Sequence, residues 1–281
     1  MIERFRVTNN LPGAQAAVVT IAQTAARLGY THIEIAWEAT GMLWLPFHCF
    51  LATNPLLQPF KPQLVCFNPK LVAKFKQGLD LRGQKDDERD AYDVAARLRF
   101  GELPLSYVPD DFWQGLRRLT RYRYKLSRSL SREKMRFQSI AFLKCSDWKR
   151  VKPFSDVFGA TSIDLLTQFT AAELRDLSHD QLADIIARRG RGRFDDPDAT
   201  ARAVQQALRS SYPIESQLDE MVTFSLATIW DHIHFIQRLM KRLDKQIGHA
   251  IDPVPNPIIT VKGLGPVITA GLLAEIVDIS R

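Results

Sequence analysis

Several features that mark common protein classes are missing from this sequence. The three cysteines, Cys49, Cys66 and Cys145, lie far apart and form no Cys-x-x-Cys pair, which argues against a zinc site and favours a reducing cytoplasm. No apolar run approaches the ~18 residues that span a membrane, and residues 1–4 do not begin a signal peptide. We therefore expect a soluble, cytoplasmic protein without a membrane partner.

The sequence also lacks the motifs of many metabolic enzymes. It contains no glycine-rich nucleotide-binding loop and no nucleophile elbow. An α/β metabolic enzyme is therefore only weakly supported.

What the chain does have is length, a core composition and a surplus of positive charge. Its 281 residues are 46% hydrophobic and 25% charged, which is typical of a soluble globular protein with more than one compact unit. The net charge is +7 and the isoelectric point is about 9.4. Such a balance favours a polyanionic partner.

The first hundred residues alternate between strand-like and helix-like patterns. We predict strands over residues 4–9, 31–36 and 64–67, and helices over 12–28, 42–51, 70–79 and 86–99. Strands separated by helices indicate an α/β domain with a largely parallel sheet. In such sheets ligands gather beyond the carboxyl ends of the strands.

Acidic residues occur at two positions that suit a metal site. Glu38 follows the second predicted strand, and Asp87 and Asp90 are three residues apart near a helix start. If the three carboxylates meet, they provide the hard oxygen ligands that Mg²⁺ or Mn²⁺ requires. Simpler interpretations remain open: acidic residues favour helix starts, and Glu38 can cap the next helix. A second set on one helix face, formed by Asp86, Asp90 and Asp93, is not excluded by spacing.

The middle of the chain is strongly basic and helical. Residues 113–152 combine a heptad-like apolar repeat with many lysines and arginines, which predicts a long amphipathic helix with a positive outer face. A second long helix over residues 213–247 is expected to pair with it or with another subunit. Thr170-x-x-Glu173 and Ser178-x-x-Gln181 are capping boxes that predict short helices between the two.

Three basic or glycine-containing segments are candidates for phosphate contact. The first is the basic helix over residues 113–152. The second is the arginine- and glycine-rich loop of residues 188–193, and the third is residues 263–265, which resemble the hairpin of helix-hairpin-helix modules. An ordinary solvated face is the alternative for the basic helix. The candidate nucleic-acid-binding residues are Arg117, Arg118, Arg121, Arg128, Arg132, Arg189, Arg191, Lys262, Gly263 and Gly265.

The order of these segments resembles the DEDD-type bacterial insertion-sequence transposases, the Piv-like group with a RuvC-like N-terminal domain. The resemblance runs over nearly the whole chain. Its segments are residues 38–41 after a strand, Asn68-Pro69 after the next, Lys85-x-Asp87-x-x-Asp90-Ala91, the helical insertion and residues 263–266. It implies that Glu38, Asp87 and Asp90 are three of the four acidic metal ligands.

The resemblance also implies an architecture. Residues 1–111 would form an RNase H or RuvC-like domain without its first strand, residues 112–250 a coiled-coil-like helical insertion, and residues 251–281 the start of a C-terminal module. Neither the family's first acidic residue nor its C-terminal serine has a counterpart here, and Asp86 stands where the family usually has threonine. We therefore expect an internal fragment or a degraded, inactive copy.

Two functional hypotheses follow. The first is a transposase or site-specific recombinase that cuts and joins DNA with Mg²⁺ or Mn²⁺. A structured guide RNA is a further partner implied by the resemblance, and homo-oligomerisation through the long helices is expected. The alternative is a non-catalytic nucleic-acid-binding or oligomerisation module built on the basic long helices, whose binding would depend strongly on salt.

Overall fold

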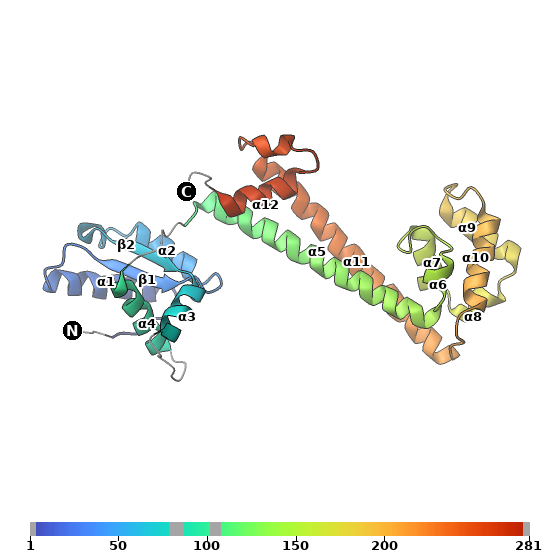
Figure 1. Cartoon of the computed structure of the whole chain (residues 1–281), viewed down its shortest axis with the longest axis horizontal. Coiled ribbons are helices and arrows are strands. Elements are labelled where there is room, and N and C mark those ends of the chain that lie inside the picture. The colour runs from blue at the N-terminus through green and yellow to red at the C-terminus, as the bar shows by residue number, and fades with distance from the viewer. Residues whose placement is uncertain (1–3, 79–86, 102–107, 278–281) are drawn as a thin grey trace. The chain divides into compact units, whose positions relative to one another are not determined.

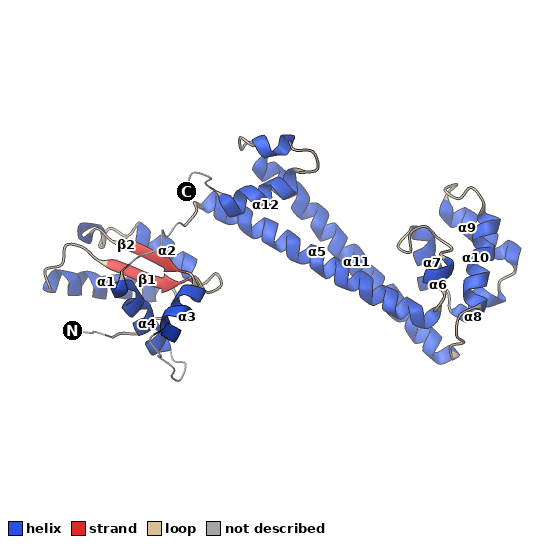
Figure 2. Cartoon of the chain, viewed as in Figure 1, coloured by secondary structure: helices blue, strands red, loops and turns tan. Residues whose placement is uncertain are grey.

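The computed structural model describes residues 4–78, 87–101 and 108–277, with the side chains of 87 and 88 left out. The chain divides into two compact units, residues 1–109 and 110–281. The described residues are mostly helical, with a small parallel sheet in the first unit (Figures 1 and 2). No helix among them is long and apolar enough to cross a membrane.

The first unit is a two-stranded parallel sheet with helices on both faces. Strand β1 pairs with β2 in a register that places Glu34 opposite Gln63 and Glu38 opposite Phe67. The elements are α1 (Leu11–Arg27), β1 (Glu34–Glu38), α2 (Trp44–Ala52), the short helix η1 (Gln58–Phe60), β2 (Gln63–Phe67), α3 (Pro69–Gly78) and α4 (Asp87–Phe100).

Alternation along β1 assigns its two faces to different helices. Ala36 packs in a cluster with residues of β2, α3 and α4, whereas Ile35 and Trp37 pack in a cluster with α1 and α2. This is the pattern that the period of two in a strand produces when both faces are buried. Glu38 has the parity of Ala36, so it belongs to the face that α3 and α4 cover.

Local signals explain where α1 and α2 begin. The Asn10 side chain accepts a hydrogen bond from the Gly13 amide at 3.0 Å and so caps α1. A Cβ atom on Gly13 would lie 1.9 Å from the Thr8 carbonyl oxygen, which requires glycine there. Helix α2 starts at Trp44, so Pro46 lies in its first turn, where proline removes no helical hydrogen bond.

The strand that we predicted over residues 4–9 is wrong. These residues form no strand, and β1 pairs with β2 alone among the described residues. Phe5 and Val7 are 48% and 44% exposed. These two side chains therefore bury too little apolar surface to stabilise residues 4–9 as a strand of the sheet. The described sheet therefore has two strands where the sequence predicted three. Glu38 also ends β1 where the sequence placed it after the strand.

The second unit is built on two long helices. Its elements are α5 (Asp111–Lys144), α6 (Trp148–Val151), α7 (Ala160–Gln168), α8 (Ala171–Asp176), α9 (His179–Gly190), α10 (Pro197–Arg209), α11 (Ser216–Ile251), the short helix η2 (Pro257–Thr260) and α12 (Pro266–Ile276). Helices α5 and α11 pack side by side along their length and run in opposite directions (Figure 1).

The apolar repeat predicted for the long helices forms the seam between them. Of the predicted repeat, Leu126 and Phe137 of α5 are buried, as are Val222 and Ile236 of α11. Arg123 of α5 adds a two-pronged ion pair with Asp244 at 2.6 and 3.1 Å. Helix α5 ends at Lys144, earlier than the basic run that predicted it, and a coiled-coil supercoil stays a prediction.

The helices α6 to α10 form a cluster at one end of this pair, which we call the tip cluster (Figure 1). Both predicted capping boxes are confirmed, at the starts of α8 and α9. Lys144 joins the tip cluster to α5: its buried ammonium donates to the carbonyls of Leu166 and Phe169 and to the Thr223 hydroxyl.

At the other end, α12 packs against the beginning of α5 and the end of α11. Leu116, Ile247 and Ala270 lie in the shared apolar cluster. Residues 251–277 thus belong to the same compact unit as the long helices. A separate C-terminal module beginning at residue 251 stays a prediction.

Candidate functional site

Glu38 is the last residue of β1 and stands at the carboxyl edge of the sheet. Its Oε2 accepts a hydrogen bond from the Thr40 hydroxyl at 3.4 Å. The next amide, that of Ala39, donates to the Phe67 carbonyl at 2.9 Å, which continues the ladder beyond the strand end. The backbone of Glu38 is therefore fixed, and within the described part of the chain only the weak Thr40 contact holds its carboxylate.

The second acidic segment begins helix α4. Asp87 is the first helical residue, and Asp86 lies outside the described residues. Asp90 follows on the same helix, which packs against β1. The structure therefore brings the helix of Asp87 and Asp90 to the strand of Glu38. No side-chain position is described for Asp87, so a meeting of all three carboxylates stays a prediction.

Lys76 of α3 joins two aspartates of α4. Its Nζ lies 2.6 Å from Asp90 Oδ1 and 3.3 Å from Asp93 Oδ2. Burial alone would lower the pKa of Lys76, but the hydrogen bonds with Asp90 and Asp93 outweigh it and hold that pKa above its ordinary value. Asp93 is buried and Asp90 is partly exposed. Asp93 thus has a structural role, and Asp90 remains accessible.

The carboxylates present suit a hard divalent cation. Lys76 engages one oxygen of Asp90, while Oδ2 of Asp90 has no partner among the described residues. Asp90 can therefore offer an oxygen without breaking its ion pair. Among the described side chains no group of three or more His, Cys, Asp or Glu is arranged to hold a metal. A complete ligand set would need Asp87, whose side chain lies outside that search.

The outer face of α5 carries a row of basic side chains, which we call the basic stripe: Arg118, Lys125, Arg128 and Arg132. Spacings of three, four and seven residues put them on one side of the helix. All four are exposed, and in the described part of the chain none has an ion pair or side-chain hydrogen bond. The stripe is therefore open to an anionic partner.

Two other arginines of the predicted set have internal partners. Arg121 makes a two-pronged ion pair with Glu275 of α12 at 2.6 and 2.8 Å. Arg117 donates to the Ala274 carbonyl at 2.8 Å. Both side chains tie α12 to α5, so they contribute less to an open positive face than sequence position alone suggested.

Exposed tyrosines border the basic stripe. Tyr122 and Tyr124 are 50% and 64% exposed, and Tyr122 lies one helical turn from both Arg118 and Lys125. Aromatic faces beside basic groups stack on unpaired bases and support binding to single strands. This pairing suits nucleic acid better than it suits a simple anion.

The arginine-rich segment that was predicted as a loop is partly helical. Helix α9 continues to Gly190, and the turn proper begins at Arg191, whose φ of 51° is left-handed. Arg189 pairs with Asp164 of α7 at 2.9 Å. Arg191 has no such partner among the described residues, so of the two predicted contacts only Arg191 is uncommitted.

The tail segment forms a turn before α12. Gly263 has a φ of +93°, which favours glycine, and Gly265 is the N-cap of α12. Lys262 is exposed beside them. The turn matches the predicted start of a helix, while the helix-hairpin-helix assignment stays a prediction.

Sequence reasoning missed two groups of interest. Lys76 carried no signal, because its partners lie in a helix that follows an intervening segment. Ser162, near the start of α7, also escaped notice. Its only sequence signal is Gly159-Ala160-Thr161-Ser162, a helix start without a capping side chain.

Comparison with known proteins gives one result. The family model of the DEDD, IS110-type group, described as a transposase, matches residues 1–143, just over half of the 281 residues. The match contains all of the first unit and almost all of α5. No curated protein matches the chain.

Proposed function

Because this chain belongs to the IS110-type DEDD transposase family, we propose that it binds the DNA of an insertion sequence through the basic stripe of α5 and holds a divalent metal at the sheet edge. The family supports the transposase assignment and the mobile element. The observation that carries the binding proposal is a row of four exposed basic side chains without partners in the described part of the chain.

Electrostatics supports a phosphate backbone as the partner. Four exposed cations on one helix face, beside two exposed tyrosines, present charge and stacking surface together. Each phosphate that a basic group neutralises releases counterions, so binding falls steeply as salt rises. The secondary candidates for contact with nucleic acid are Arg117, Arg121, Arg189, Lys262, Gly263 and Gly265. The three arginines in this set have internal partners.

For the metal we propose Glu38, Asp87 and Asp90 as ligands, with Mg²⁺ or Mn²⁺ as the ion. The family generally depends on divalent metals, and the carboxylate donors suit them. When bound, the ion supplies charge neutralisation at the phosphodiester that is cut. The chain's own contribution is to present Glu38 from a strand end, Asp90 from α4, and Lys76 as the group that orients Asp90.

The DNA proposal is tested by charge reversal. We expect the triple variant Arg118→Glu, Arg128→Glu, Arg132→Glu to bind a 30-base-pair duplex at least about tenfold more weakly, with a salt slope smaller by about three. Fluorescence anisotropy at several salt concentrations measures both. The matched control reverses Arg202, Arg209 and Arg238, which lie elsewhere on the same unit. Equal loss in stripe variant and control would contradict a specific stripe.

The metal proposal is tested by titration calorimetry with Mn²⁺. Glu38→Gln, Asp87→Asn and Asp90→Asn should each weaken metal binding about tenfold or more, because each removes a charged oxygen ligand. Glu34→Gln at the exposed start of β1 is the control and should bind as the unchanged chain does. If none of the three ligand substitutions weakens metal binding, the proposed site is wrong.

The alternative function is a non-catalytic nucleic-acid-binding or oligomerisation module. The free basic stripe favours it, because that surface works without any metal. Metal-dependent cleavage or joining of DNA would favour the enzyme. Guide-RNA binding, oligomerisation through the long helices, an inactive copy and a cytoplasmic location stay predictions, and ultracentrifugation addresses the oligomer directly.

A further inference from the structure

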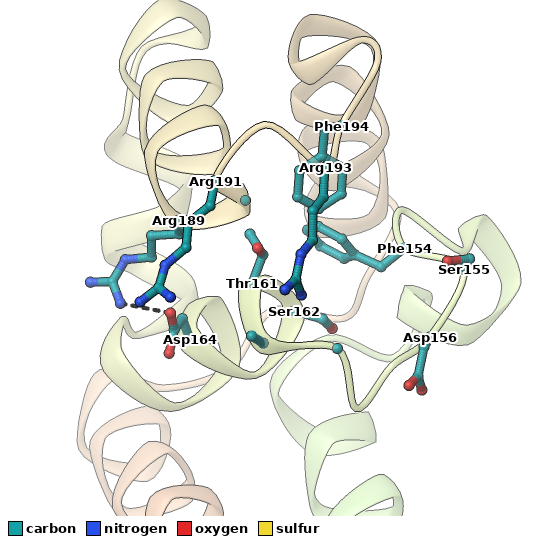
Figure 3. A pocket seen from close by; sticks show the side chains of 13 residues that line it. Phe154, Ser155, Asp156, Thr161, Ser162, Asp164, Arg189, Arg191, Arg193 and Phe194 are labelled. Atoms are coloured by element: carbon teal, nitrogen blue, oxygen red, sulfur yellow. Dashed lines mark ion pairs between the residues drawn. The ribbon is translucent and has the colours of Figure 1, made fainter.

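The tip cluster contains a cleft that neither the family match nor the basic stripe explains. It has a volume of about 320 Å³ and lies between the start of α7 and the turn after α9 (Figure 3). Its polar lining includes Thr161, Ser162, Asp164, Arg189, Arg191 and Arg193. The volume is at the small end for ligand sites in proteins, so a compact polar group suits it.

The helix start inside this cleft has free amides. The N-cap of α7 is Gly159, which has no side chain to cap the helix. Ile163 is the first amide to bond within the helix, to the Gly159 carbonyl at 3.0 Å. The amides of residues 160–162 therefore have no partner among the described residues. Free amides and the positive end of the helix dipole together attract an anion.

A buried hydroxyl points to a ligand independently of the helix start. Ser162 is completely buried, lines the cleft, and its Oγ has no hydrogen-bond partner among the described residues. Thr167, a buried hydroxyl of the same helix, donates to the Ile163 carbonyl at 2.8 Å. A buried hydroxyl without a hydrogen-bond partner destabilises the fold unless another group satisfies it. A bound acceptor oxygen would do so.

Two guanidinium groups complete the lining. Arg193 reaches from the turn toward Ser162 (Figure 3), and Arg191 stands on the same turn. Neither has an ion pair or side-chain hydrogen bond among the described residues. Two carboxylates also line the cleft: Asp164 is neutralised by Arg189, and Asp156 accepts from the Phe158 amide at 2.9 Å. Positive charge therefore exceeds negative charge.

The wall behind the arginines is rigid. Phe154 and Phe194 meet edge to face with ring centroids 5.7 Å apart. Gly190 lets this wall close, because a Cβ atom there would lie 2.3 Å from the Phe194 ring. The turn that carries Arg191 and Arg193 is therefore held against a packed aromatic pair, which fixes where its side chains originate.

We propose that this cleft binds a backbone phosphate of a nucleic-acid strand, held by the free amides of α7, the Ser162 hydroxyl and the guanidinium groups of Arg191 and Arg193. The choice of a nucleic-acid phosphate over a free one rests on the proposed DNA-binding function. The cleft is a second contact, on the tip cluster, separate from the basic stripe on α5.

The experiment measures binding of a labelled 30-base-pair duplex by the full chain over a range of salt concentrations. Arg193→Gln should weaken binding about tenfold and lower the salt slope by about one, because one charged phosphate contact is lost. Ser162→Ala should weaken binding about fivefold with the slope unchanged, because a neutral hydroxyl releases no counterion. Arg209→Gln, an exposed arginine of α10, is the matched control and should change little.

A parallel measurement separates the two sources of phosphate. Inorganic phosphate is titrated into the full chain while the melting temperature is followed, and Ser162→Ala and Arg193→Gln are compared with the unchanged chain. Stabilisation that both substitutions abolish, together with their loss of DNA binding, supports the proposal. Stabilisation by phosphate with unchanged DNA binding means a site for a free phosphate and overturns it.

The remaining outcomes distinguish this proposal from the function it rests on. If cleft variants bind DNA normally while stripe variants lose binding, the cleft proposal fails and the proposed function stands. If the unchanged chain binds no DNA at all, both fail as statements about nucleic acid. Both cleft substitutions remove a group without adding bulk, and circular dichroism of each variant confirms that the helices are retained.

Discussion

At the scale of single residues, Lys144 shows how one buried cation can organise a junction. It is fully buried at the end of α5, and its ammonium satisfies the carbonyls of Leu166 and Phe169 at the end of α7. Burial lowers the pKa of Lys144 to about 8, although the carboxylates of Asp219 and Glu173 act in the opposite direction. Its charge therefore costs free energy in the folded state.

This cost gives the stability of the helical unit a pH dependence. Between about pH 8 and the ordinary lysine pKa of 10.5, the unfolded chain holds a proton that the folded chain has released. The free energy of unfolding should therefore rise with pH across this window, by an amount on the order of 3 kcal/mol at most. Urea denaturation followed by circular dichroism at pH 7 to 10 measures it.

The control for this prediction is Lys144→Gln, which keeps a donor and has no charge to titrate. Burial raises the pKa of the neighbouring Cys145 thiol, which lowers stability over the same pH range. The difference between the unchanged chain and Lys144→Gln isolates the lysine. If the unchanged chain and Lys144→Gln show the same dependence of unfolding free energy on pH, the prediction for Lys144 is wrong.

Single residues were also where sequence reasoning reached its limit. It placed Glu38, Asp87 and Asp90 at a strand end and a helix start, because local patterns determine those positions. It could not find the ion pairs of Lys76 with Asp90 and Asp93, since these depend on how α3 meets α4. It also ranked Arg121 with Arg128, although only Arg121 is tied to Glu275.

At the scale of elements, the start of α5 holds α12 through two neighbouring turns. Arg117 donates to the Ala274 carbonyl near the end of α12, and Arg121 donates to the Glu275 carboxylate. Glu275 has a pKa below its usual range, mainly because of the hydrogen bond from Arg121. A cation at a helix end satisfies carbonyls that have no partner within the helix.

This contact predicts how α12 responds to substitution. Arg117→Ala should lower the stability of α12 docking by about 1–2 kcal/mol, because the Ala274 carbonyl loses a charged donor. Hydrogen exchange of the α12 amides should become faster by roughly tenfold. The neighbouring Arg118→Ala, which has no partner among the described residues, is the control. Exchange that is equally fast in both variants would contradict the role of Arg117.

Helices were predicted well where the sequence contains local capping signals. The capping boxes at Thr170 and Ser178 were found because a side chain and a backbone amide three residues apart suffice to form them. The expected strand at residues 4–9 failed because a strand needs a partner, and alternation of Phe5 and Val7 does not supply one. The end of α5 at Lys144 likewise depends on contacts with α7 and α11.

At the scale of the whole molecule, the division into two units has a direct consequence for folding. Residues 110–281 contain two apolar clusters of their own, one in the tip and one beneath α12. We predict that a fragment of residues 110–281 folds alone, with a helical circular dichroism spectrum and a cooperative thermal transition. A broad, non-cooperative transition would show that the fragment needs the first unit.

The length of α5 sets a minimum size for any strand that reaches both basic regions. Arg132 ends the basic stripe, and Lys144 touches α7 further along the same helix. At 1.5 Å per residue these positions are roughly 18 Å apart, and the first stripe residue, Arg118, is roughly 40 Å from Lys144. A nucleic-acid strand rises about 3.4 Å per nucleotide, so about five nucleotides are needed to reach both regions and about twelve to cover the whole stripe as well. Oligonucleotides shorter than about five nucleotides would engage one region at a time, so binding measured against oligonucleotide length separates the two contributions.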